Sequence, residues 1–140
     1  MFENILLAVD GSEHAINAAR MAAGLANSMN SQTLRIVAAY DPIPVHLGDP
    51  YMQNAVNSRI METEEVIDRV VQVVWNVSAQ IYTEMIEGNP AETIIDLARN
   101  RNSDVIVMGA RGLGKLPGLV LGSTSQKVVS YAPCPVLIVR

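Results

Sequence analysis

The chain has 140 residues, of which 49% are hydrophobic and 17% are charged, and its net charge at pH 7 is -4. This length suits one ordinary domain over residues 1–140, and the composition can fill a core, which excludes an intrinsically disordered chain. The acidic balance argues against general binding to nucleic acid. The single cysteine, Cys134, excludes an internal disulfide and a cysteine-rich metal site.

Neither a membrane anchor nor a leader is expected from the sequence. No apolar run approaches the roughly 20 residues that a membrane helix needs. The first residues, MFENILLAVDGS, lack the basic start and the long apolar core of a signal peptide. We therefore expect a cytoplasmic protein that has no membrane partner.

Short apolar runs alternate with segments of helical periodicity in the first half of the chain. Residues 4–10 predict a strand that is buried on both faces, and residues 13–29 predict an alanine-rich helix. Residues 33–41 predict a second strand, which a proline-rich connection follows. A long helix is expected over roughly 54–77. Its predicted inner face is apolar and consists of Val56, Ile60, Ile67, Val71 and Val74.

The second half of the chain continues this alternation. Residues 79–88 predict a third strand, and NPAE begins a helix with Asn89 as its cap and Glu92 reaching back to complete a capping box. The run DVIVMG predicts a fourth strand, STSQKVVSYA a short helix, and CPVLIVR a last strand. The order β-α-β-α-β-α-β-loop-α-β predicts a single-domain, doubly wound, Rossmann-like α/β fold: a five-stranded parallel sheet with helices on both faces.

The loop after the fourth predicted strand concentrates glycine and lacks acidic residues. Residues 108–126 contain five of the nine glycines, and no Asp or Glu occurs in residues 105–140. Two known phosphate motifs fail, because a leucine replaces the hydroxyl residue of the P-loop and a proline replaces the third glycine of the dinucleotide fingerprint. The spacing that fits throughout is G-x2-G-x9-G-[ST], from Gly109 to Ser123.

This segment has the chemistry of an anion-binding site. Glycines let the backbone approach a ligand, and successive exposed N–H groups form a concavity for anions. The free N–H groups at the start of the last helix favour negative charge as well. Arg111 and Lys115 add positive charge, and Ser123, Thr124 and Ser125 add hydroxyl donors. We predict that the segment holds the phosphates of a nucleotide.

Simpler roles stay open for several of these residues. Ser123 and Gln126 have the spacing of a capping box, so Ser123 could serve only as a helix cap. Asp10 precedes Gly-Ser and could cap the first helix. Arg111 could be a solvated surface charge, and the glycines could form only a flexible loop.

The sequence resembles the nucleotide-binding branch of the universal stress protein family over essentially its whole length. The resemblance rests on NILLAVDGS, EGNPAETIIDLA and SDVIVMGARGLGKLPGLVLGSTSQKVVSYAPCPVLIVR. It implies that adenine lies between the ends of the first two strands and that the motif residues hold the ribose and phosphates. The candidate cofactor-binding residues are Ala8, Val9, Asp10, Ala39, Met108, Gly109, Arg111, Gly112, Gly122, Ser123, Thr124 and Ser125.

The resemblance also implies a function. We expect a stress-response regulator that binds ATP, or ADP or AMP, and forms a nucleotide-dependent homodimer through residues 135–140. No catalytic residue and no direct metal ligand are expected, although Asp10 could hold Mg²⁺ through water. No general base is evident near the site, so ATP hydrolysis would be weak at most. The alternatives are a slow ATPase or phosphotransferase, a flavin-binding electron carrier, and a dimerising scaffold without nucleotide.

Overall fold

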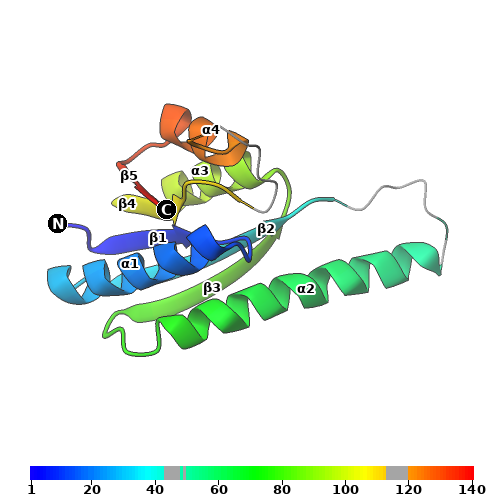
Figure 1. The fold of residues 1–140 in the computed structure, drawn as a ribbon, viewed down its shortest axis with the longest axis horizontal. Helices are drawn as coiled ribbons and strands as arrows, with labels where there is room; N and C mark the ends of the chain where they lie inside the picture. The colour runs from blue at the N-terminus through cyan, green and yellow to red at the C-terminus, as the bar shows by residue number, and fades with distance from the viewer. Residues whose placement is uncertain (43–47, 49, 113–119) are drawn as a thin grey trace.

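The computed structural model describes residues 1–42, 48, 50–112 and 120–140. They form a five-stranded parallel sheet in the order β3-β2-β1-β4-β5, with helices on both faces (Figure 1), which confirms the predicted fold. The elements are β1 (Asn4–Ala8), α1 (Glu13–Met29), β2 (Thr33–Tyr40), α2 (Tyr51–Val73), β3 (Gln80–Glu87), α3 (Pro90–Asn100), β4 (Val105–Gly109), α4 (Ser123–Tyr131) and β5 (Val136–Val139).

β1 lies at the centre of the sheet and is buried on both faces, as its apolar sequence predicts. Because side chains alternate along a strand, Ile5 and Leu7 join one core and Leu6 and Ala8 join the other. The first core contains the buried apolar residues of α1 and α2, and the second contains those of α3 and α4. The two layers of helices therefore lie on opposite faces of the sheet.

The order of the strands reverses beside β1. The chain runs from β1 outward to β2 and β3, and then returns to the other side of β1 with β4 and β5. β1 and β4 are neighbours, and Ala8 at the end of β1 is in register with Met108. Ligands of doubly wound folds lie at this position, beyond the carboxyl ends of the strands.

Local capping interactions fix the starts of α1 and α3. The Ser12 hydroxyl accepts the Ala15 N–H at 3.2 Å, and the Asn89 side chain accepts the Glu92 N–H at 3.1 Å, as predicted for Asn89. The Glu92 carboxylate, however, pairs with Lys127 Nζ on α4 at 3.2 Å. This ion pair connects α3 with α4 and replaces the second half of the expected capping box.

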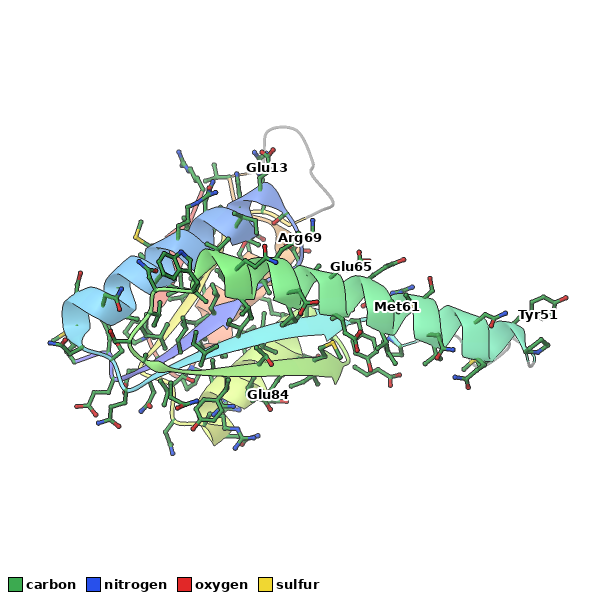
Figure 2. The ribbon with its side chains drawn as sticks, turned by 90° about the horizontal axis from the view of Figure 1, so that it is seen from below. Glu13, Tyr51, Met61, Glu65, Arg69 and Glu84 are labelled. Carbon is green, nitrogen blue, oxygen red and sulfur yellow. The ribbon has the colours of Figure 1, made fainter. Side chains whose placement is uncertain are left out.

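α2 differs most from its prediction. It spans Tyr51–Val73 rather than 54–77. Ile67 is buried as predicted, but Val56 and Ile60 are only half-buried. The reason is visible in Figures 1 and 2, where the N-terminal half of α2 extends past the ends of the strands and so has no sheet to cover.

Membrane insertion is not indicated by any helix that the structure describes. Within residues 1–42, 50–112 and 120–140, no helix combines the length and the apolar character that crossing a bilayer requires.

Candidate functional site

A pocket of about 900 Å³ lies at the carboxyl ends of β1, β2 and β4. This volume is within the range of roughly 300–1,000 Å³ that small-molecule sites occupy. All twelve candidate residues from the sequence line the pocket. Eight lining residues that the sequence did not single out come from α2, and they are Ala55, Ser58, Arg59, Glu62, Thr63, Glu65, Val66 and Arg69.

The start of α4 offers free amide groups to the pocket. Gly122 is the N-cap of the helix, and its carbonyl accepts the first helical hydrogen bond, from the Gln126 N–H at 3.0 Å. The amides of residues 123–125 therefore have no acceptor within the helix. These residues line the pocket at the positive end of the helix dipole, which is a suitable environment for an anion.

The hydroxyl groups at this helix start have different surroundings. Ser123 is exposed and Gly122 is the cap, so the alternative in which Ser123 only caps α4 is wrong. Ser125 is 2% exposed, and its hydroxyl donates to the Ala110 carbonyl at 2.7 Å. The Ser125 hydroxyl is therefore used in a hydrogen bond within the protein, and the Ser125 backbone amide is the group that is available to a ligand.

Ala110 joins the two ends of the glycine-rich segment. Its carbonyl accepts the Gly122 N–H at 2.7 Å as well as the Ser125 hydroxyl, and its N–H donates to the Val139 carbonyl of β5 at 2.8 Å. Ala110 is 1% exposed. The sequence gives no sign of this role, because all three contacts use backbone atoms of Ala110 and join residues far apart in the chain.

The three motif glycines have different surroundings. A Cβ atom on Gly109 would lie 2.7 Å from His14 Cβ and 2.9 Å from the His14 carbonyl carbon. Gly109 therefore permits close packing of β4 against α1, which corrects the expectation that it clears space for a ligand. A Cβ on Gly112 would collide with the Asp10 carboxylate, whereas a Cβ on Gly122 would be in ordinary contact, 3.5 Å from the nearest backbone atom.

Asp10 lies in the turn between β1 and α1. Its Oδ1 accepts the Ser12 N–H at 3.0 Å, and its Oδ2 adjoins Gly112. Ser12 is the N-cap of α1, so the alternative in which Asp10 caps this helix is wrong. Asp10 is exposed and lines the pocket, so its carboxylate can accept hydrogen bonds from a ligand.

His14 contacts the start of the glycine-rich segment, which the sequence did not reveal. Its Nδ1 accepts the Arg111 N–H at 3.3 Å, which fixes the start of the glycine-rich segment to α1. The Arg111 amide is thus used within the protein, and the guanidinium is the part of Arg111 that a ligand can contact.

Three arginines line the pocket, Arg59 and Arg69 from α2 and Arg111 from the glycine-rich segment. None of the ion pairs among the described residues includes them. Lys115, which was also predicted to add positive charge, lies outside the described residues. In the described part of the chain, no group of three His, Cys, Asp or Glu side chains is arranged to hold a metal ion.

Known proteins resemble this chain over its whole length. Residues 1–140 match the Universal stress protein family. The universal stress protein in the QAH/OAS sulfhydrylase 3′ region of Thermus aquaticus is 44% identical to this chain over 140 residues. The alignment covers 100% of both chains. The structure of universal stress protein UspA from Lactobacillus plantarum has a TM-score of 0.88 at 30% identity, covering 99% of this chain and 98% of that one.

The fold also matches a structure with a bound nucleotide. The universal stress protein from Archaeoglobus fulgidus in complex with dAMP has a TM-score of 0.75 at 22% identity, and the match covers 100% of both chains. The family match and the identity to the Thermus aquaticus protein establish the relationship. This chain belongs to the universal stress protein family.

Proposed function

We propose that this chain binds an adenine nucleotide in the pocket at the carboxyl ends of β1, β2 and β4, and that it acts as a nucleotide-responsive regulator in the stress response. The observation that carries the proposal is the start of α4, where three amides without helical acceptors line a pocket of about 900 Å³. The complex of a universal stress protein of the same fold with dAMP supports the choice of an adenine nucleotide.

The pocket suggests how the ligand would be oriented. The phosphates would lie at residues 122–125, because the amides and the helix dipole there favour an anion. The adenine would lie between the ends of β1 and β2, near Asp10 and Ala39, which both line the pocket. The proposed ligand is ATP, or ADP or AMP. Mg²⁺ would reach the Asp10 carboxylate through water.

The chemistry of the pocket favours binding over catalysis. Asp10 adjoins the glycine-rich segment, but one of its carboxylate oxygens already accepts the Ser12 amide. His14 Nδ1 is engaged by the Arg111 amide. His14 Nδ1 is therefore not available as a general base, whereas Asp10 still has its Oδ2 for a ligand or a water molecule and would support only slow hydrolysis. ATP hydrolysis would then be weak at most, and a turnover assay of purified protein measures it.

The nucleotide site is tested directly by identifying what the protein carries. Freshly purified protein is denatured, and the released small molecules are analysed by mass spectrometry, followed by calorimetric titration with ATP, ADP and AMP. We expect an adenine nucleotide in the released fraction or saturable binding in the titration. Protein that releases no nucleotide and gives no heat with any of the three would contradict the proposal.

We also propose a homodimer that forms through residues 135–140. β5 is at the edge of the sheet, and three of its four residues are only half-buried. An apolar edge strand exposes unpaired backbone groups that pair readily with another chain. Light scattering should give twice the 15.1 kDa mass of one chain. Leu137→Lys should reduce it to one chain, and a thermal melt is needed as a control because Leu137 also packs against the core.

A further inference from the structure

One face of α2 lines the pocket along much of its length. The lining residues recur at intervals of three and four, from Ala55 to Arg69, so they lie on one side of the helix. Figure 2 shows that Tyr51 and Met61 lie on the part of α2 that extends past the sheet, whereas Arg69 lies beside the start of α1, near Glu13. The part of α2 around Arg69 is therefore the part that adjoins the strand ends.

Arg69 approaches the turn between β1 and α1. A Cβ on Gly11 would lie 3.7 Å from Arg69 Nη2 and 3.1 Å from Val66 Cγ2. Gly11 has a φ of +88°, a conformation that favours glycine. The missing side chain at Gly11 thus lets α2 bring Val66 and Arg69 against the turn that carries Asp10.

Within the part of the chain that the structure describes, no carboxylate engages the terminal nitrogens of Arg69. The Arg69 Nε donates to the Glu65 carbonyl at 3.4 Å, which is a contact within the helix. No ion pair among residues 1–42, 50–112 and 120–140 includes Arg69, although the Glu65 carboxylate is one turn away on the same helix. The side chain is exposed and lines the pocket, so its planar end can face a ligand.

α2 and α4 contact the pocket from opposite faces of the sheet. Ile67 and Val70 of α2 belong to one core, and Val128 of α4 belongs to the other. A nucleotide that places its phosphates at the start of α4 therefore presents its other end, the base, to α2. A guanidinium stacks well on an aromatic ring, and Val66 beside it supplies an apolar contact.

We propose that Arg69, with Val66, covers the purine ring of the bound nucleotide, so that α2 is the wall of the pocket that recognises the base. This inference rests on the proposed binding of an adenine nucleotide. It assigns Arg69 to the base and leaves the phosphates to the amides at the start of α4.

The test compares Arg69→Gln with Arg20→Gln in calorimetric titrations with adenosine and with AMP. Arg20 is an exposed arginine of α1 that does not line the pocket, so Arg20→Gln is the matched control. We expect Arg69→Gln to weaken the binding of both ligands by the same factor, about tenfold or 1.4 kcal/mol, because they share the base. Arg20→Gln should leave the affinity for adenosine unchanged.

Other outcomes separate this inference from the function on which it rests. An Arg69→Gln protein that binds adenosine as tightly as the wild type overturns the inference, and so does a loss confined to AMP, which would place the guanidinium on the phosphate. A wild-type protein that binds neither ligand overturns the proposed function and this inference with it. Arg69→Lys keeps the charge without the planar group, so full recovery of adenosine binding in that variant contradicts stacking.

Discussion

The two walls of the pocket are built from different parts of the chain. At the start of α4, the wall is main chain: the amides of residues 123–125 and the backbone of the motif glycines. On the opposite side, the wall is made of α2 side chains, including Val66 and Arg69. Nucleotide affinity should therefore fall when a substitution adds atoms to the main-chain wall. At the α2 wall, the affinity should fall when a substitution removes side-chain atoms.

The main-chain wall should be most sensitive to Gly122→Val. The position accepts a Cβ, since its φ is -74° and the nearest backbone atom would be 3.5 Å away. The two further methyl groups of valine have to enter the space beside residues 111–112 or in front of the α4 amides. We expect the affinity for ATP to fall by at least about 100-fold, or 2.7 kcal/mol, in calorimetric titration.

Gly122→Ala is the matched control and should bind ATP as the wild type does, because its Cβ makes only ordinary contacts. If the valine variant keeps its melting temperature and still binds ATP, the phosphates are held elsewhere.

Gly109→Ala tests whether Gly109 is required for packing against α1 rather than for ligand binding. Its Cβ would press against His14 of α1 at 2.7 Å, so we expect a loss of about 1–3 kcal/mol in the free energy of unfolding. Urea denaturation measures this loss. Gly24→Ala is the control, because no atom lies within 4 Å of its added Cβ, and alanine in the middle of α1 should stabilise by about 0.5–1 kcal/mol. An unchanged stability for Gly109→Ala would refute the packing role.

Ser125→Ala examines a side chain within the main-chain wall. The variant loses the hydrogen bond to the Ala110 carbonyl, but this carbonyl still accepts the Gly122 N–H, so the cost should be about 1 kcal/mol of unfolding free energy. Ser130→Ala, which removes an exposed hydroxyl from the same helix, should cost less. A large loss of nucleotide affinity without a loss of stability would instead assign the Ser125 hydroxyl to the ligand.

The smallest effect of the pocket substitutions is expected on the labelling of Cys134, which lies at the opposite end of the sheet from the pocket. Burial raises the pKa of the Cys134 thiol, the negative charge of Asp104 raises it further, and a backbone hydrogen bond with Ile106 opposes both. Less thiolate is therefore present at neutral pH, so maleimide labelling should be slower than for a free thiol and should accelerate as the pH rises. Gly122→Val and Arg69→Gln should label at the wild-type rate. A faster rate in either variant would mean that its loss of binding reflects unfolding.

The difference between the walls also explains what the sequence could predict. The main-chain wall is local: motif glycines, the hydroxyl residues and the start of α4 follow one another along the chain, so their spacing was informative. The fold was predictable as well, because the apolar runs such as β1 alternate regularly with amphipathic helices.

The remaining features depend on contacts between distant segments. Val66 and Arg69 belong to the site only because α2 lies against the turn at Gly11, and no local pattern marks them. His14 and Ala110 are likewise defined by a hydrogen bond across 97 residues and by contacts with β5 and α4. The overhang of α2 was missed because helical periodicity does not show where a sheet ends.

The hydrogen bond between Ala110 and Gly122 affects how much the length of the glycine-rich segment can change. A single hydrogen bond of 2.7 Å between the Ala110 carbonyl and the Gly122 amide closes the chain between them into a ring with fixed ends. Because the entropy of closing such a ring grows slowly with its length, residues can be inserted between its ends at a low entropic cost. An insertion inside the ring should therefore leave the free amides at the start of α4 in place, so the ring is a natural point for grafting a reporter peptide.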